Sequence, residues 1–523
     1  MKKAIGQKVG KRMDKEWIQT FRTEIKAFSE KVAEFEQGEI DRKAYKGFSG
    51  GMGSYAQKDA HCHMLRLRLP GGRLTKERLK FIAETVEKYQ VSRMKFTTCE
   101  AIQLHDLKGE QLPEIMEKAI DSAIISKGGG GDNPRNVMSS PLSGAQQGEY
   151  LDVMPWAEAA TEYLLSICRD IHMPRKLKIA FGNGVDDCVH TAFRDMGFMA
   201  NQDGTFSLHI AGGLGGNPKM GILVEEQVAP EDVLYYIKAM IDTFCAHGNY
   251  QNRAKARTRF MQETLGIEGL KKTYLEMVEK AKMAGGLQLS VQPREIVKQG
   301  DGTIEHVRVL PQKQAGLYTV KYHPIGGCPN PQKMRELYET IQAMPEVECR
   351  VAPDESLYIL HLTAKEAEKV LRATADSART EFENSVACIG AAVCQQGLRD
   401  SQTVLQAAKT AVEEANIPDG ALPRIRISGC PSSCAAHQAG TIGFQGWSRP
   451  LDGKLASAFK MFLDGSDELG KEQFGKEMGV IYEKDLPALL VELGQAAAKA
   501  GQNWSEWSKE HAGQQKEIIA KYL

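Results

Sequence analysis

The sequence predicts an α+β fold with a pseudo-two-fold, duplicated architecture. Two pairs of similar segments indicate the duplication, and helical patterns between strand-like runs indicate a mixture of helices and strands. Chance similarity is the alternative, because β-α-β patterns are common in unrelated proteins. If the chain is duplicated, a functional site is expected at the interface between its halves, where pockets commonly form.

The first pair of similar segments lies within residues 63–110 and 318–366. Each is predicted to contain a strand, a turn with Pro and two Gly, an amphipathic helix and two further strands. When the segments are aligned by their Pro-Gly turns, His105 lies opposite His361, with a difference of two residues in length.

The second pair of similar segments is Pro-Arg-Lys-Leu-Lys-Ile at 174–179 and Pro-Arg-Ile-Arg-Ile at 423–427, each before a loop that contains glycine. Apolar residues at helical spacing predict a helix over 404–415 that ends before Pro418. A second amphipathic helix is predicted over 485–500, with Pro487 tolerated in its first turn.

Composition indicates a large protein with several cores. The 523 residues are 42% hydrophobic, which is enough for two to four domains. Lys plus Arg and Asp plus Glu both number 67, so no global field favours nucleic acid or a membrane surface. No apolar run approaches the ~18 residues of a membrane span. A cytoplasmic location is expected. The basic stretch Met1–Arg12 is predicted to be a solvated tail, or alternatively a segment that attracts an acidic electron carrier.

Four cysteines near the C-terminus have the pattern of iron-sulfur ligands. They are spaced C-x5-C, 35 intervening residues, and C-x3-C. Both pairs lie in loops of small residues, where backbone N–H groups can approach the sulfurs. The quartet is Cys388, Cys394, Cys430 and Cys434.

Zinc, disulfide bonds and simple burial account less well for this quartet. Zinc sites favour C-x2-4-C pairs, so the first pair does not match a zinc site. Disulfides are disfavoured because the cysteines number 11, which is odd, and no secretory signal is evident. Buried thiols account for cysteines without a partner at ligand spacing. These are Cys62, Cys168, Cys188, Cys245, Cys328 and Cys349.

The motif Gly-Cys-Pro-Ser-Ser-Cys at 429–434, followed by Ile-Gly-Phe at 442–444, resembles the signature of siroheme-containing sulfite and nitrite reductases. The C-x5-C pair matches the same family. The resemblance implies a 4Fe-4S cluster on the four cysteines and a siroheme whose iron is also bound by Cys434. One departure is Ser432, where the family commonly has Asn; Ser432 is retained as a cofactor-binding candidate.

The resemblance also implies how the duplicated chain is organised. Two half-domains would pair into a ferredoxin-like platform, and two larger α+β domains would enclose the cofactors. The expected divisions are an N-terminal extension (1–60), a first half-domain (61–127), a first siroheme-binding domain (128–300), a second half-domain (310–373) and a domain with the cluster cysteines (374–523).

A small anionic substrate and a cofactor with many carboxylates both require Arg and Lys. The motif Arg-Leu-Arg-Leu-Pro-Gly-Gly resembles the family's first arginine motif, which assigns a catalytic role to Arg66 and a secondary, cofactor-binding role to Arg68. The segment around Arg135 resembles the family's second arginine motif, and the segment with Lys176 and Lys178 resembles its lysine pair. The resemblance assigns catalytic roles to these three residues as well. Alone, each motif is more typical of a solvated face.

Siroheme carboxylates are expected to be bound by two groups of residues. One belongs to the first repeat, and the other to a basic run after Gly248 that could also be a plain helix face. In the first group, Cys99 replaces an arginine that is common in the family, which removes one contact. The candidates are Lys95, Thr97, Gln103 and His105, and then Asn252, Arg253, Lys255, Arg257 and Arg259.

The resemblance implies six-electron reduction of sulfite to sulfide, with nitrite reduction to ammonia as the alternative. Sulfite is favoured because the family's sulfite enzymes tend to have Lys at the position of Lys178, where nitrite enzymes have Asn. A non-catalytic cofactor-binding protein is a remote alternative. No flavin or nicotinamide fingerprint is present, so a ferredoxin or similar small carrier is expected to supply the electrons.

Overall fold

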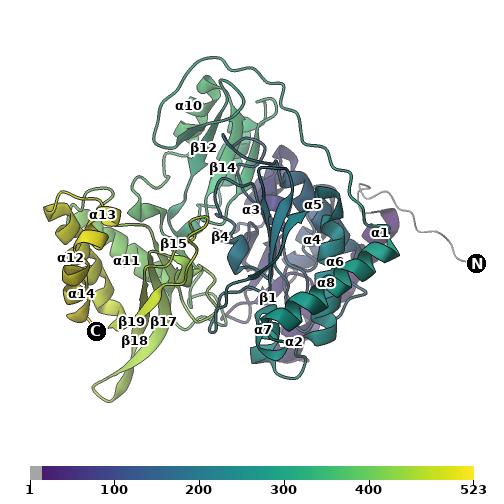
Figure 1. The fold of residues 1–523 in the computed structure, drawn as a ribbon, viewed down its shortest axis with the longest axis horizontal. Helices are drawn as coiled ribbons and strands as arrows, with labels where there is room; N and C mark the ends of the chain where they lie inside the picture. The colour runs from purple at the N-terminus through teal and green to yellow at the C-terminus, as the bar shows by residue number, and fades with distance from the viewer. Residues whose placement is uncertain (1–13) are drawn as a thin grey trace, which may run out of the picture.

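The computed structural model describes residues 14–523, so the basic N-terminal stretch lies outside the described residues. Two antiparallel sheets form the centre (Figure 1). Strands β2-β5-β4 of one sheet have the same order as β12-β14-β13 of the other, which confirms the duplication. The first sheet contains β1 (Ser54–Ala56), β2 (His63–Leu67), β4 (Arg93–Phe96) and β5 (Ile102–Leu107); the second contains β3 (Arg73–Leu74), β11 (Val309–Pro311), β12 (Tyr318–Tyr322), β13 (Glu348–Val351) and β14 (Leu357–Leu362).

Both central sheets share one hydrophobic core. The predicted apolar face of α3, which includes Leu79, Ile82 and Val86, is buried there, and α3 packs against α9 of the second copy. Burial of these stripes joins the two half-domains into one body. The helices around this core are α1 (Lys15–Glu36), α2 (Arg42–Ser49), α3 (Lys76–Lys88), α4 (Gln111–Asp121), α9 (Lys333–Ile341) and α10 (Ala364–Ala373).

The alignment of His105 with His361 is wrong by one residue. Leu104 pairs with Leu65, and its counterpart Ile359 pairs with Val320. Asp106 and His361 therefore occupy equivalent positions, each at a register shift and each with positive φ, 58° and 62°. Both copies have this bulge, and the offset arises because the second copy is one residue longer between its Pro-Gly turn and the bulge.

Two larger mixed sheets repeat a second topology. In each, three parallel strands precede two antiparallel strands. The PRKLKI and PRIRI segments lead into or form β7 and β16, which are equivalent strands. The first sheet contains β6 (Met138–Ser139), β7 (Ile179–Gly182), β8 (Met196–Ala200), β9 (Phe206–Ile210) and β10 (Ile222–Val228); the second contains β15 (Val386–Ala387), β16 (Ile425–Ser428), β17 (Ile442–Leu451), β18 (Lys454–Leu463) and β19 (Lys476–Tyr482).

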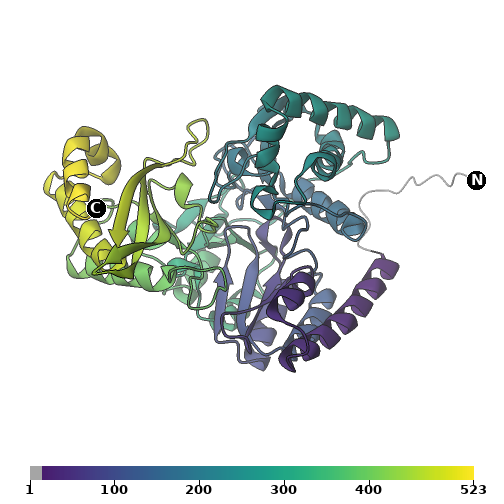
Figure 2. The ribbon, with the colours of Figure 1, turned by 90° about the horizontal axis from the view of Figure 1, so that it is seen from below.

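Helices cover these larger sheets. The two helices predicted near the C-terminus are present as α11 and α12, and Asp400 caps the first. Figure 2 shows the C-terminal part at one end, with the teal helices of the first large domain and the purple N-terminal helices at the other. The helices are α5 (Met154–Ile167), α6 (Val233–His247), α7 (Met261–Thr264), α8 (Ile267–Ala284), α11 (Ser401–Glu414), α12 (Leu486–Lys499), α13 (Trp504–Glu510) and α14 (Ala512–Ala520). Among residues 14–523, no helix has the length and apolar character needed to cross a bilayer.

The Pro-Gly turns of the two repeats bring the central platform against the larger domains. Gly71 and Gly326 both have positive φ, 57° and 59°. A Cβ at Gly71 would lie 2.5 Å from Sδ of Met154, and one at Gly326 would lie 2.5 Å from Oε1 of Gln402. Only glycine combines this backbone conformation with so close an approach.

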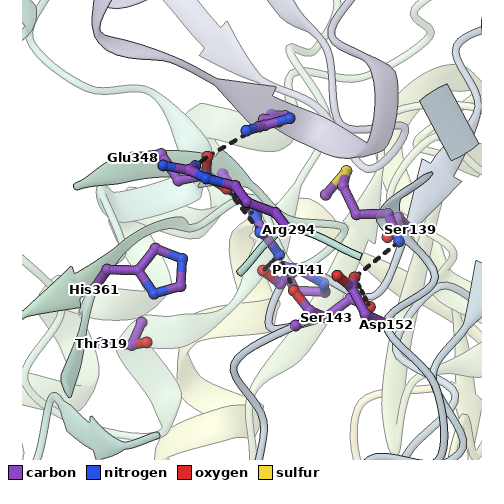
Figure 3. A network of polar contacts seen from close by, with 12 residues as sticks. Ser139, Pro141, Ser143, Asp152, Arg294, Thr319, Glu348 and His361 are labelled. Carbon is purple, nitrogen blue, oxygen red and sulfur yellow. Dashed lines mark hydrogen bonds and ion pairs between the residues drawn. The ribbon is translucent and has the colours of Figure 1, made fainter. Parts of the chain in front are cut away.

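A buried carboxylate, Glu348, ties four parts of the chain together (Figure 3). It accepts hydrogen bonds from Arg73 at 2.9 Å, Arg294 at 2.7 Å and Arg350 at 2.7 and 2.9 Å. Arg350 also donates to the carbonyl of Pro141. Burial opposes ionisation of Glu348, but the charges of Arg350 and Arg73 outweigh it and lower the pKa of the carboxyl to about 2.

Glu348→Gln should reduce the free energy of unfolding by about 3 to 5 kcal/mol, because it leaves buried guanidinium groups without their counter-charge. Urea unfolding measures this loss, with the exposed Glu279→Gln as control. The pKa is lower in the folded state, so the stabilisation is complete above the ordinary pKa of 4.5 and is lost as pH falls towards about 2. An equal acid dependence in Glu348→Gln and wild type would contradict this assignment.

Candidate active site

The cluster cysteines follow the ends of adjacent parallel strands. Cys388 comes directly after β15, and Cys430 lies two residues after β16. Since β15 and β16 are parallel neighbours, their C-terminal loops leave the same edge of the sheet. The amide of Gly429 donates to Sγ of Cys388 at 3.1 Å, and Oγ of Ser401 lies 3.0 Å from the same sulfur. Ser401 begins α11, whose positive end favours a thiolate there.

The four thiols come together around Cys434. Burial, followed by repulsion from Cys388, raises the pKa of the Cys434 thiol to about 12, and Cys430 and Cys394 add to the repulsion. Cys434 is nonetheless the exposed member of the quartet, as expected of a side chain in the wall of a deep recess. No three Cys, His, Asp or Glu side chains of residues 14–523 are arranged to hold a single metal ion.

The two predicted catalytic arginines meet at one carbonyl. Arg66 on β2 and Arg135 both donate to the carbonyl of Gly129, Arg135 at 2.5 Å. Arg135 also donates to the carbonyl of Gly131 at 2.7 Å. Burial and the charge of Arg66 lower the pKa of Arg135 to about 10. The loop at 128–131 thus positions both guanidinium groups and is no phosphate cradle.

The lysine pair lies immediately before β7, close to Cys434. Burial, and then the charges of Lys178 and Arg257, hold the pKa of Lys176 well below its usual range; Arg135 contributes, and Cys434 opposes the shift. Burial also lowers the pKa of Lys178, despite the neighbouring Cys99. The four cations predicted to be catalytic therefore lie close enough to influence one another and the cysteine quartet. The space bordered by Arg66, Arg135, Lys176, Lys178 and Cys434 is called the recess.

Two predicted cofactor-binding residues have partners within the protein. Arg68 donates to the carbonyls of Lys127 at 2.8 Å and Arg135 at 3.0 Å, so it braces the loop that carries Arg135. Lys95 donates to the carbonyl of Gly326 and pairs with Glu355, both at 2.6 Å. Its ammonium is buried between the two repeats, where both of these partners belong to the second repeat. The siroheme contact of Lys95 stays a prediction.

Other candidates of the first repeat support Arg66. The amide of Gln103, with its oxygen towards Arg66, accepts two hydrogen bonds at 2.5 and 3.1 Å. His105 lies 3.3 Å from that amide and 3.2 Å from Oε1 of Gln57. Burial lowers the pKa of His105 to about 3, so the imidazole is neutral and positions Gln103. The hydroxyl of Thr97 accepts from the amide of Ala101 within its own turn.

The basic run after Gly248 contains exposed residues, which are called the rim, and more deeply buried residues. Arg253 is exposed and pairs with Asp132. Arg257 and Arg259 lie in the interior, where Arg257 binds Asp195 at 2.8 Å. Exposed members at the rim are Asn252 and Lys255, and Ser432 is exposed in the cluster loop.

Sequence reasoning missed Asp195 and Thr98. The Asp195 carboxylate accepts from the amide of Lys178 at 2.8 Å and also binds Arg257 and Thr258. It is the anion that organises the cationic recess. The excess of cations among the candidates indicated that a carboxylate must balance them, but it did not indicate which residue supplies that carboxylate. The hydroxyl of Thr98 donates to the carbonyl of Cys434 at 2.7 Å, which links the first repeat to the cluster loop.

The residues around the recess fit an anionic cofactor with several carboxylates. Six buried or partly buried arginines have a guanidinium nitrogen without a hydrogen-bond partner within residues 14–523, and four of the six, named below, are candidates for binding the cofactor. Unsatisfied charged donors are costly in a protein interior. Their number indicates that anionic acceptors belong there. The atoms are Nε of Arg135, Nη2 of Arg194, Nε of Arg257 and Nη1 of Arg259.

Comparisons with known proteins agree with this site. Residues 55–121 match the family described as "Nitrite/Sulfite reductase ferredoxin-like half domain", and residues 130–282 match "Nitrite and sulphite reductase 4Fe-4S domain". Ferredoxin–nitrite reductase of Synechococcus elongatus is 26% identical over 82% of this chain and 85% of its own. Sulfite reductase [ferredoxin] 1 of Mycolicibacterium paratuberculosis is 25% identical over 84% and 82%.

The fold is similar to that of the Mycobacterium tuberculosis NirA protein, with a TM-score of 0.76, 22% identity and 92% coverage of both chains. The segment that matches the 4Fe-4S family, 130–282, does not contain the cysteine quartet. It is the first copy of the larger domain, whose sheet topology the second copy repeats with the cysteines added. The two matched segments and these relatives together support the siroheme- and 4Fe-4S-containing sulfite and nitrite reductases, a family of oxidoreductases, as the family that this chain resembles.

Proposed function

We propose that the protein catalyses the six-electron reduction of nitrite to ammonia. Relatives named ferredoxin–nitrite reductase, from a cyanobacterium and from plants such as Arabidopsis thaliana, align over 82% of this chain. They support nitrite over the sulfite that Lys178 by itself favoured. The observation that carries the proposal is the pairing of Lys178 with Cys99.

Cys99 offsets the second ammonium of the lysine pair. Burial opposes ionisation of this thiol, but the charges of Lys178 and Arg194 prevail and lower its pKa to about 6. The lowered pKa favours the thiolate form of Cys99, whose negative charge would offset the ammonium of Lys178. Such a pair suits the singly charged nitrite better than the more highly charged sulfite.

The recess residues would bind the anion and supply protons. Arg66 and Arg135, fixed by the carbonyl of Gly129, would hold the oxygen atoms of the substrate. Lys176, whose pKa is lowered mainly by burial, would release its proton readily as N–O bonds break. The cluster would be held by Cys388, Cys394, Cys430 and Cys434. When bound, it and siroheme would supply the electrons and the iron at which the anion is reduced.

Sulfite is the second candidate substrate, because the lysine that the family's sulfite enzymes tend to have is present as Lys178, close to the charges of Arg194 and Arg257. Enzymes that distinguish two small anions by charge alone discriminate modestly. A sulfite activity lower than the nitrite activity is therefore expected.

A ferredoxin is proposed as the electron donor, as the names of the relatives suggest for those proteins. The surface beside Cys394 suits such a carrier. Leu398 and Trp447 expose 48% and 38% of their surfaces there, and the guanidinium of Arg399 binds only neutral acceptors. Turnover with reduced ferredoxin as sole donor tests this partner.

Steady-state kinetics with a chemically reduced dye test the substrate. Wild type should have the higher kcat/KM for nitrite. Cys99→Ala should raise the sulfite-to-nitrite ratio of kcat/KM by about tenfold, because it leaves the charge of Lys178 uncompensated. Lys178→Asn should lower kcat/KM for sulfite far more than for nitrite, by a transition-state cost of about 2 to 4 kcal/mol.

Cys188→Ala is the matched control, because Cys188 packs against the same small apolar cluster as Cys99. Burial raises the pKa of the Cys188 thiol well above its usual value, so this thiol is neutral and its removal should leave the ratio unchanged. A higher wild-type kcat/KM for sulfite would reverse the proposal. An unchanged ratio in Cys99→Ala would refute the charge argument.

A further inference from the structure

Arg194 is a buried arginine that forms no ion pair with a carboxylate among residues 14–523. It lies between η2 (Thr191–Phe193) and β8 and is 5% exposed. Its Nε donates to the carbonyl of Val189 at 2.9 Å. Its Nη2 has no hydrogen-bond partner within residues 14–523. A guanidinium held in this way is complementary to a carboxylate or similar anion.

The neighbours of Arg194 place it in the wall of the recess. Val189, whose carbonyl anchors it, packs with Met138 and Ala180 against Cys99. The charge of Arg194 contributes to the lowered pKa values of Cys99 and Lys178. The guanidinium therefore lies close to the point where the first repeat meets the lysine pair.

The buried carboxyl group of Glu100 does not satisfy Arg194. Glu100 feels its charge, but Oε1 of Glu100 is itself without a hydrogen-bond partner among the described residues. The Oε2 atom is bound by the amide of Ser139 at 3.0 Å. Since donor and acceptor are both unsatisfied, the two groups do not meet.

Arg194 acts mainly on the second lysine of the pair. Its charge contributes to the lowered pKa of Lys178, whereas Arg135 and Cys434 are among the groups that act on Lys176. Arg194 is therefore assigned to the part of the site around Cys99 and Lys178.

We propose that Arg194 binds a carboxylate of siroheme through Nη2 and so supplies the cation that Cys99 does not. The inference rests on the proposed function, because it requires siroheme in this recess. It assigns Arg194 to cofactor binding and leaves the substrate to Arg66, Arg135 and the lysine pair. It also explains how a thiol can occupy position 99 without loss of the cofactor.

The test measures cofactor content in addition to activity. Arg194→Gln should weaken siroheme binding by about tenfold, as expected for one charge-assisted contact, while the acid-labile sulfide of the cluster stays at the wild-type level. Arg194→Lys, which keeps the charge, should lose less. The control is Arg78→Gln, since Arg78 also donates to backbone carbonyls, those of Arg73 and Ala123, but lies in the platform.

A second variant keeps the test decisive. Cys99→Arg in the Arg194→Gln background should restore siroheme binding, because it returns a guanidinium to the same wall. Wild-type siroheme affinity in Arg194→Gln, loss of the cluster together with siroheme, or no rescue by Cys99→Arg would each overturn the assignment. A wild-type protein that binds no siroheme would instead remove the proposed function itself.

Discussion

Cys434→Ser is expected to abolish turnover with either anion and to disturb both cofactors together. Cys434 is the cysteine that is most exposed to the recess, and the charge of Lys176 acts on it across that space. A sulfur there can belong to the cluster and face the substrate side at once. Mutation of residues that only contact a metal ligand already lowers metal affinity or activity by about 10- to 100-fold. Removal of the ligand itself should therefore lower kcat by more than about 100-fold.

Cofactor analysis distinguishes this effect from misfolding. Both the visible absorbance of siroheme and the iron and acid-labile sulfide content should fall in Cys434→Ser, with the circular dichroism spectrum unchanged. Cys245→Ser is the control, because Cys245 lies near the end of α6 in the first large domain, where its thiol donates to the carbonyl of His172. A Cys434→Ser protein with wild-type turnover would exclude the assignment of Cys434.

Lys176→Gln should lower kcat/KM for nitrite by about 100- to 1,000-fold, the usual cost of removing a preorganised charge at a reacting anion. Lys176 is the cation whose charge acts on Cys434, so it is the nearest candidate for proton delivery. Lys255→Gln is the matched control, since Lys255 belongs to the nearby basic run but is exposed. Dye-dependent turnover measures both.

The pH dependence gives this prediction a second readout. Burial and the charge of Lys178 lower the pKa of Lys176, and only the protonated ammonium can bind the anion and donate a proton. Wild-type kcat/KM should therefore be full below the lowered pKa and fall as pH rises through it. Lys176→Gln should lack this decline. The same decline in both proteins would assign it to another group.

Much of the architecture could be predicted from the sequence because it depends on local patterns. The duplicated strands, the Pro-Gly turns and the apolar stripe of α3 all repeat with the period of the secondary structure. The residue-by-residue alignment of β5 with its counterpart β14 could not be predicted, since the second copy has one more residue between its Pro-Gly turn and the bulge, and hydrophobic periodicity does not reveal it.

The roles of individual polar side chains were less predictable. Lys95 matched a cofactor motif but pairs with Glu355, which is 260 residues away in the chain. Arg68 shares its strand-and-turn motif with Arg66, yet its donors are used by the 127–135 loop. A motif specifies which group is present, whereas the choice of partner depends on which distant backbone atoms the fold brings within about 3 Å.

The sequence alone determined the cysteine quartet, the duplication and the set of cations, because spacing, periodicity and charge are properties of the chain itself. Only the tertiary structure decided which cations share the recess, that Asp195 organises them, and that Cys99 and Arg194 meet at Lys178. The physical reason is that electrostatic interactions depend on distance and burial. Both are fixed when parallel strands from two copies of one unit bring their loops to a common edge.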